Sequence, residues 1–132
     1  MGILKKLFGM CETKKPKDPG CWILSGGRIE IDLNRAGKLA EQGGAIRLEG
    51  KGLAGRILVI QDDTGKFHAY SNRCTHMGRR IDPVPGSSDV RCCSVMGSVF
   101  NVKGEIVSGP AKENLKQYET VILGSILSIH IV

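Results

Sequence analysis

Alternating apolar and polar positions predict β-strands through the first half of the chain. Residues 29–33 (IEIDL) place apolar side chains at every second position, which is the pattern of a half-buried strand, and residues 46–48 repeat it. Residues 56–61 (RILVIQ) form a mostly apolar run that predicts a more deeply buried strand. The turn-forming sequence DDTG at 62–65 then leads into a further strand, KFHAYS, at 66–71.

The second half of the chain predicts further strands and two hairpins. A strand is expected from Val90, a hairpin over 101–107 around Lys103-Gly104, and a final hairpin over 119–132 around Gly124-Ser125. In that last hairpin Leu127, Ile129 and Ile131 are expected to face inward. Only residues 34–44 allow a short helical turn. Short strands at this spacing predict an all-β fold, either an antiparallel sandwich or a small barrel.

The first 21 residues differ from the rest of the chain. Residues 3–8 would place four apolar side chains on one stripe of a short helix, with two lysines beside it. Such a segment could lie on an anionic membrane surface or dock on a partner, or it could be a frayed tail, because ten residues make a marginal helix. Residues 12–20 read as a polar linker broken by prolines. We therefore predict a basic tail and linker over 1–21 and a folded domain over 22–132, anchored by Trp22.

Composition excludes several classes of function. No apolar stretch is long enough for a membrane helix, and the apolar start lacks the cleavage site of a signal peptide, so the expected location is the cytoplasm. Cysteines stay reduced there, and five of them do not suggest a disulfide framework. Half of the net charge of +6 falls in residues 1–19. Because no basic cluster is interleaved with aromatic residues, nucleic-acid binding is not expected.

Two loops carry the candidate chemistry. NRCTHMG holds Cys74 and His76 one residue apart, and CSVMG holds Cys93 and Met96 two residues apart, with 16 residues between His76 and Cys93. A glycine follows each pair and lets the backbone turn tightly around a bulky group. Thiolates and imidazoles in this arrangement suggest a metal centre.

The two loops resemble those of the Rieske family of [2Fe–2S] proteins, whose signature is C-x-H followed, some fifteen to seventeen residues later, by C-x-x-H. The resemblance covers Ile29–Val132 and includes the stretch FNVKGEIVSGPAKENLKQY with its Gly109-Pro110-Ala111 turn. In this resemblance Gly97 and Phe100 fix the register, so Cys93, not Cys92, is the matching second cysteine. The resemblance implies an antiparallel Rieske-type β-sandwich with a cluster-binding subdomain of two loops at about 72–112.

The resemblance also implies a ligand set. Cys74 and Cys93 would hold the inner iron and His76 the outer iron, with Met96 standing where the family has its second histidine. A thioether is neutral like imidazole but is a weaker donor, so such a cluster would be more labile and more oxidising. Since a thioether carries no proton, only His76 could couple protonation to reduction.

Three other readings of the loops remain open. Met96 could be an apolar plug in a domain that has lost its cluster. Zinc or another metal could bind Cys74, His76 and Cys93 and leave one position open. Cys92 could supply a third thiolate, although adjacent strand residues point to opposite faces.

The resemblance extends to further residues, which indicate what type of Rieske protein the chain is. The extra disulfide of the quinol-oxidising members would fall at Arg79 and Val95, and so it is absent. Ser98 matches the serine that donates a hydrogen bond to the cluster, and Gly109 and Pro110 belong to the turn that shields it. Phe100 stands where those members have tyrosine, as in the soluble ferredoxins. This mixture suggests a ferredoxin-like protein of intermediate potential.

The remaining candidates have structural interpretations. His68 and His130 are expected on the surface, and Cys92 is expected to pack as a small hydrophobic side chain. Cys11 and Cys21 flank the linker and are expected to be free thiols.

The predicted function is single-electron transfer through a Rieske-type [2Fe–2S] cluster. The chain would be a carrier, not an enzyme, and would need a reductase and an acceptor, either an oxygenase or a membrane redox complex reached through the basic tail. It would be cytoplasmic or peripheral to the inner membrane. The alternative is a cluster-free Rieske-like domain that binds another protein as a regulatory subunit.

Overall fold

The computed structural model describes residues 12–75, 78–93 and 97–131. Within these ranges the chain forms antiparallel strands and two short 3-10 helices, η1 (Pro19–Cys21) and η2 (Gly37–Ala40). The strands, in chain order, are β1 (Trp22–Ser25), β2 (Arg28–Asp32), β3 (Ala45–Leu48), β4 (Ile57–Gln61), β5 (Phe67–Ser71), β6 (Ile81–Pro83), β7 (Val90–Cys92), β8 (Val99–Phe100), β9 (Ile106–Ser108), β10 (Gln117–Leu123) and β11 (Ile126–His130). The all-β antiparallel class expected from the sequence is confirmed.

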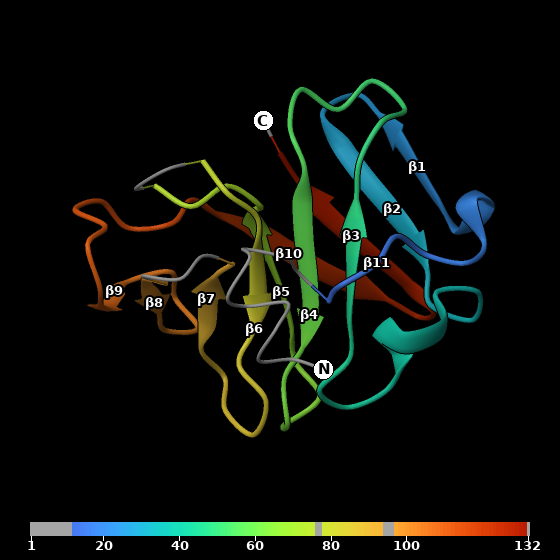
Figure 1. Cartoon of the computed structure of the whole chain (residues 1–132). Helices are drawn as coiled ribbons and strands as arrows, with labels where there is room; N and C mark the ends of the chain where they lie inside the picture. The colour runs from blue at the N-terminus through green and yellow to red at the C-terminus, as the bar shows by residue number, and fades with distance from the viewer. Residues whose placement is uncertain (1–11, 76–77, 94–96, 132) are drawn as a thin grey trace.

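The strands form a larger and a smaller sheet. The larger has the order β1-β2-β11-β10-β5-β4-β3, and the smaller has the order β6-β7-β8-β9 (Figure 1). In the larger sheet, strand β10 pairs with β11 over five residue pairs but with β5 over only two. It therefore joins two halves, and one core cluster takes side chains from both, as expected for a sandwich.

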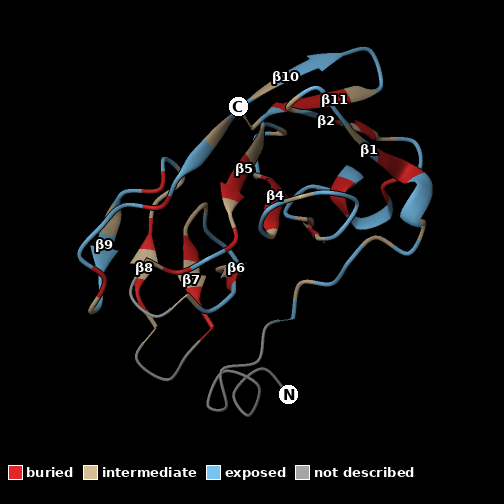
Figure 2. Ribbon diagram, turned by 90° about the horizontal axis from the view of Figure 1, so that it is seen from above, coloured by how far each residue is buried: buried red, intermediate tan, exposed pale blue. Residues whose placement is uncertain are grey.

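Strand periodicity explains this core. In β2 the burial alternates, with Ile29 and Ile31 buried between more exposed residues, and the partner strand β11 presents Leu127 and Ile129 at the paired positions. By contrast, all five residues of β4 are buried, which matches its continuous apolar run. Figure 2 shows buried residues along β4 and β11 and exposed residues at the far end of β10. These predicted strands and the predicted turn over 34–44, found as η2, are confirmed.

A second core cluster lies where the smaller sheet meets the larger one. It combines Leu58 and Tyr70 of the larger sheet with Ile81, Cys92 and Phe100 of the smaller. The Tyr70 hydroxyl donates a 2.6 Å hydrogen bond to the carbonyl of Val102 in the β8–β9 connection. Burial raises the pKa of Tyr70. This contact fixes the smaller sheet to the larger one.

The segment before η1 crosses from the smaller sheet to the larger one. The backbone N–H groups of Glu12 and Thr13 donate to the carboxylate of Asp82 on β6, at 2.6 and 3.1 Å. The backbone N–H of Arg47 on β3 then donates to the carbonyl of Lys14 at 2.9 Å. Residues 12–14 are therefore hydrogen-bonded to both sheets.

Trp22, the residue expected to anchor the start of the domain, packs in the core. Trp22 is buried, and the Lys51 ammonium lies 4.4 Å from the centroid of its ring. In the described part of the chain no helix has the length and apolar character that a membrane crossing requires.

Candidate metal centre

Backbone hydrogen bonds to consecutive carbonyls bring the two predicted loops together. The N–H of Cys74 donates to the carbonyl of Arg79 at 2.7 Å, and the N–H of Cys93 donates to the carbonyl of Arg80 at 2.8 Å. Strand pairing continues this register, since Ile81 lies opposite Cys92. Two cysteines 19 positions apart in the sequence are thus held at adjacent places on one backbone segment.

The first loop is closed at its base. The N–H of Gly78 donates to the carbonyl of Cys74 at 2.8 Å, and Gly78 has a φ of +70°, a conformation that favours glycine. The Arg56 guanidinium donates from Nη2 to the carbonyl of Gly78 at 3.2 Å. Asn72 is buried, and its side-chain oxygen accepts from the N–H of Ile81 at 2.7 Å. The Cys74 side chain, only 1% exposed, carries a free thiol.

The second loop is closed in a similar way. The N–H of Cys92 donates to the carbonyl of Ser98 at 2.8 Å, across residues 93–97. Cys93 is 5% exposed and is disulfide-bonded in this structure. The expectation that every cysteine is reduced is therefore wrong at Cys93. The fold brings a second sulfur to this loop, and no local pattern around Cys93 predicts it.

The Gly109-Pro110-Ala111 turn is attached to the second loop through Ser98. The N–H of Ala111 donates to Ser98 Oγ at 2.9 Å, and both residues are buried. Gly109 has a φ of +95°, and a Cβ there would lie 2.5 Å from the Cα of Ser98. Only glycine allows this approach. The serine and the turn singled out in the sequence are therefore in direct contact.

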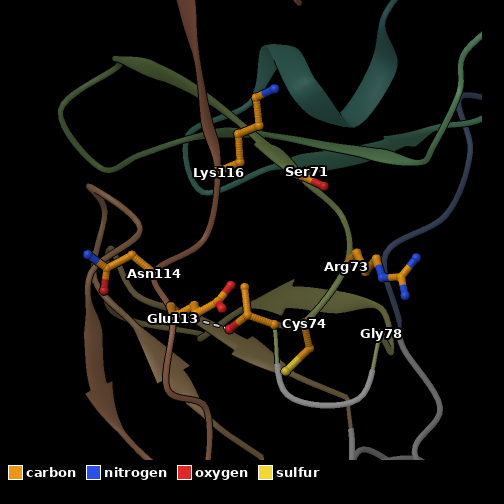
Figure 3. A pocket seen from close by; sticks show the side chains of 8 residues that line it. Ser71, Arg73, Cys74, Gly78, Glu113, Asn114 and Lys116 are labelled. Carbon is orange, nitrogen blue, oxygen red and sulfur yellow. Dashed lines mark hydrogen bonds between the residues drawn. The ribbon is translucent and has the colours of Figure 1, made fainter.

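The same turn segment is attached to the first loop. Thr75 Oγ1 donates to the carbonyl of Glu113 at 2.6 Å, the dashed line in Figure 3. Beside this contact lies a pocket of about 600 Å³. Its lining comprises Ser71, Arg73, Cys74, Thr75, Gly78, Glu113, Asn114 and Lys116. Figure 3 shows the Cys74 sulfur directed to the side of the loop away from Ser71 and Lys116.

Positive charge surrounds the first loop. Burial, together with the neighbouring guanidinium of Arg80, lowers the pKa of Arg56, and Arg47 and Arg73 add to this effect. Arg73, Arg79 and Arg80 are exposed. A centre that gains negative charge on reduction would be stabilised by these cations.

Two of the four predicted ligands are positioned by this structure and two are not. Cys74 and Cys93 lie at adjacent sites, whereas His76 and Met96 fall outside the described residues. Among the residues that are described, no three His, Cys, Asp or Glu side chains gather as a metal site. The ligand set therefore stays a prediction.

Several residues at this centre had no sequence signal. Arg79 and Arg80 act through their carbonyls, which any residue type could supply. Asn72 and Thr75 are ordinary polar residues, and only the fold reveals their hydrogen bonds. Arg56 lies 18 positions before Cys74, too far for any loop motif to include it.

Comparison with known proteins identifies the class. Residues 33–119 match the model of the Rieske [2Fe-2S] domain, which is more than half of the chain. The chain therefore belongs to the Rieske [2Fe-2S] domain family, and this membership implies a [2Fe–2S] cluster.

Two curated relatives agree with this assignment. YhfW of Bacillus subtilis, whose name classes it with the Rieske 2Fe-2S iron-sulfur proteins, is 33% identical over 78 residues, or 59% of this chain and 14% of its own length. The cytochrome b6-f complex iron-sulfur subunit of Chlorobaculum thiosulfatiphilum is 32% identical over 72 residues, or 54% of this chain and 39% of its own length. The chain thus spans a small part of each relative.

Solved structures show the same fold. The ferredoxin of carbazole 1,9a-dioxygenase from Nocardioides aromaticivorans aligns with a TM-score of 0.61 and 17% identity, over 78% of this chain and 98% of that one. The plasma membrane Rieske protein PetC3 of Synechocystis aligns with a TM-score of 0.53 and 25% identity, over 63% of this chain and 84% of that one.

The described residues fit a [2Fe–2S] cluster. Two cysteines are held at adjacent backbone positions beside glycine-containing loops, and thiolates are the usual cluster ligands. A cysteine in a disulfide cannot ligate iron, so binding requires that Cys93 be reduced.

Four other predicted residues have clear outcomes. Cys21 is a buried free thiol and His130 is exposed, as expected. Cys92 packs in the second core cluster, also as expected. The expectation for His68 is wrong: its side chain is 16% exposed, and Nε2 lies 2.7 Å from Oδ2 of Asp62. The tight 62–66 turn places this carboxylate over strand β5, and alternation along the strand could not show it.

Proposed function

We propose that this protein carries single electrons through a Rieske-type [2Fe–2S] cluster and has no catalytic site for a substrate of its own. Its membership of the Rieske family supports this proposal. The observation that carries it is the placement of Cys74 and Cys93, whose N–H groups bind the consecutive carbonyls of Arg79 and Arg80. This arrangement would let two thiolates reach one iron.

Each residue of the centre has a proposed role. Cys74 and Cys93 would hold the inner iron and His76 the outer iron, and Met96 stands at the fourth family position. The bound group supplies a reversible one-electron couple. Ser98 holds the Gly109-Pro110-Ala111 turn against the second loop, which would limit access of water. Arg56 holds the first loop through the carbonyl of Gly78.

Proton coupling would be weaker than in a cluster with two histidines. His76 is the one imidazole that the family positions supply here, because Met96 replaces the other. The reduction potential should therefore depend on pH through one titrating group instead of two.

The partners would be a reductase and an electron acceptor. Complexes between oxygenase and ferredoxin in carbazole 1,9a-dioxygenase are among the structures with this fold, so an oxygenase is one reasonable acceptor. A membrane redox complex is the other, and the basic N-terminal segment could bring the chain to an anionic membrane surface. The proposed location is the cytoplasm or the periphery of the inner membrane.

One observation favours a second function. Because Cys93 is disulfide-bonded, this structure is compatible with a cluster-free form. In that form the chain would be a Rieske-like interaction or regulatory subunit, and no redox reaction would pass through it.

The deciding experiment measures iron and acid-labile sulfide in protein purified anaerobically under dithiol reductant, with an EPR spectrum after dithionite reduction. About two irons and two sulfides per chain with a rhombic signal are expected. Colourless protein without sulfide would leave the interaction subunit as the function. Met96→His should stay coloured and make the potential depend more steeply on pH.

A further inference from the structure

Four arginines lie around the end of the first cysteine loop. The guanidinium of Arg73 packs against Gly78, because a Cβ added at this glycine would be 3.2 Å from Nε and 3.5 Å from Cζ of Arg73. Arg56 Nη2 donates to the carbonyl of the same glycine at 3.2 Å. Arg79 and Arg80 follow it directly in the chain and are exposed, as is Arg73. We call these four residues the arginine cluster.

Within the described residues, no carboxylate of the protein pairs with the arginine cluster. The ion pairs found there all involve other basic residues. The nearby carboxylate of Glu49 is engaged elsewhere, at 3.0 Å from Arg47 Nε and 3.9 Å from Lys15 Nζ. The buried Nε of Arg56 has no hydrogen-bond partner in the described structure.

The arginines of the cluster also repel one another. Burial lowers the pKa of Arg56, and the positive charges of Arg80 and Arg73 lower it further. Like charges held together without counter-charges destabilise a folded chain, and an anionic group that binds to them removes this cost. The arrangement therefore indicates a surface that receives negative charge from another molecule.

The arginine cluster borders a hollow in the surface. The pocket of about 600 Å³ beside the first loop is lined by the basic residues Arg73 and Lys116 and by one acidic residue, Glu113. Figure 3 shows Lys116 and Arg73 on the two sides of Ser71. Because Cys74 lines the same pocket, a molecule bound there would lie next to a proposed ligand of the inner iron.

The chemistry of this surface fits a protein better than a lipid membrane. None of the exposed large apolar side chains in the described part of the chain lines the pocket. Binding to a membrane surface usually combines basic residues with apolar side chains that enter the lipid. Guanidinium groups form paired hydrogen bonds of defined geometry with carboxylates. A hollow can also receive a side chain that projects from a protein partner.

We propose that the arginine cluster and the adjoining pocket are the docking surface for an acidic patch on a redox partner protein. The inference rests on the proposed function and adds to it the place and the charge of the contact. Complementary charge would speed the encounter and orient the partner at the first loop. The electron would then pass near Cys74, and the rate of transfer would fall as the ionic strength rises.

The first test measures binding of a fluorescein-labelled peptide of ten glutamates to the full chain by fluorescence anisotropy. Arg73→Gln/Arg80→Gln should weaken this binding about tenfold. The matched control is Arg28→Gln/Lys38→Gln, which removes the same charge from exposed positions on β2 and η2, elements that do not line the pocket. The control should change the dissociation constant less than about twofold. Circular dichroism checks that both variants are folded.

A second readout follows the electron itself. Ferricyanide, an anion, and tris(phenanthroline)cobalt(III), a cation, each take one electron from the reduced cluster and become ferrocyanide and the cobalt(II) complex. In stopped-flow measurements Arg73→Gln/Arg80→Gln should slow oxidation by ferricyanide about tenfold, whereas oxidation by the cobalt complex should stay unchanged or become faster. An equal change with both oxidants would contradict docking by charge.

The other outcomes also decide the proposal. Equal losses of peptide affinity in the two double variants would overturn it, because the peptide would then respond to net charge alone. Lost binding to phosphatidylserine vesicles with unchanged peptide binding would assign the arginine cluster to a lipid surface and overturn it. Displacement of the peptide by inorganic phosphate at a far lower ionic strength than by sodium chloride would assign the cluster to a small anion, with the same consequence.

The peptide measurement separates this inference from the proposed function, because it needs no iron. If the chain holds no cluster, the proposed electron transfer falls. Selective loss of peptide binding in Arg73→Gln/Arg80→Gln would then still support an acidic protein partner at this surface.

Discussion

At the scale of single residues, the candidate centre depends on close backbone approaches that tolerate little change. Gly109 combines a positive φ with contact to Ser98, and the buried Ser98 hydroxyl accepts the hydrogen bond of Ala111. These contacts hold the shielding turn on the second loop.

Gly109→Ala should destabilise the fold by about 2–4 kcal/mol, because a methyl group would add a steric clash to the strain of a positive φ. Gly86→Ala is the matched control, since Gly86 also has a positive φ, +76°, but a Cβ there would meet no other atom within 4 Å. Its cost should be only about 1–2 kcal/mol. Urea denaturation of both variants measures the difference, and equal costs would contradict the clash.

The Asp62 carboxylate predicts a pH dependence of stability. Burial opposes its ionisation, but hydrogen bonds from Thr64, His68 and Lys66 outweigh this and hold its pKa well below the usual value. Between the folded pKa and the unfolded value of about 3.9 the unfolded chain binds more protons, so stability falls as the pH is lowered through this range. Denaturation at pH 7 and pH 3 should show a smaller loss in Asp62→Asn than in the parent. An equal loss in both would assign the acid sensitivity to other groups.

At the scale of elements, the segment before the first strand connects the two sheets. Residues 12–14 bind Asp82 on β6 and Arg47 on β3. The sequence presented this stretch as a polar linker, because its hydrogen bonds use main-chain groups and leave no side-chain signature.

Asp82→Ala should release this segment. Two backbone N–H groups lose a charged acceptor, and each such bond contributes roughly 1.5–3 kcal/mol. Trypsin should then cleave after Lys14 at least about tenfold faster, which mass spectrometry can follow. Asp89→Ala, in the turn that connects β6 and β7, should leave the cleavage rate nearly unchanged. Equal acceleration in both would indicate general loosening of the hairpin.

At the scale of the whole molecule, arginines from different parts of the fold lie around the first cysteine loop. Arg56 reaches this loop from the position just before β4 of the larger sheet, while Arg79 and Arg80 directly precede β6 of the smaller sheet. The positive charge around this loop therefore comes from residues next to both sheets.

Arg56→Gln should lower the reduction potential of the bound cluster more than Arg79→Gln does. Both variants remove one positive charge, but Arg56 is half-buried and bonded to the loop, whereas Arg79 is exposed and screened by solvent. At an effective dielectric constant of about 20, a charge roughly 10 Å away contributes on the order of 1 kcal/mol. Spectroelectrochemical titration of both variants measures this. Identical shifts would show that Arg56 acts only as a structural support.

The sequence by itself determined the strands, the family and the candidate loops. Period-two alternation reports which face of a strand is buried, and the cysteine and glycine positions of the loops are local patterns. The buried strands at 29–33 and 57–61 and the final hairpin could all be anticipated for that reason.

Only the tertiary structure decided which distant groups meet. The Asp62–His68 pair, the reach of Arg56 to Gly78 and the fixation of Glu12 at Asp82 join residues from different elements. Such contacts depend on strand register and on main-chain hydrogen bonds, which are available to any residue type and so leave no pattern in the sequence. The surroundings of Cys93 were not predictable for the same reason, because strand register and main-chain hydrogen bonds determine them. Composition suggested separate reduced thiols, whereas the fold brings a second sulfur to this loop.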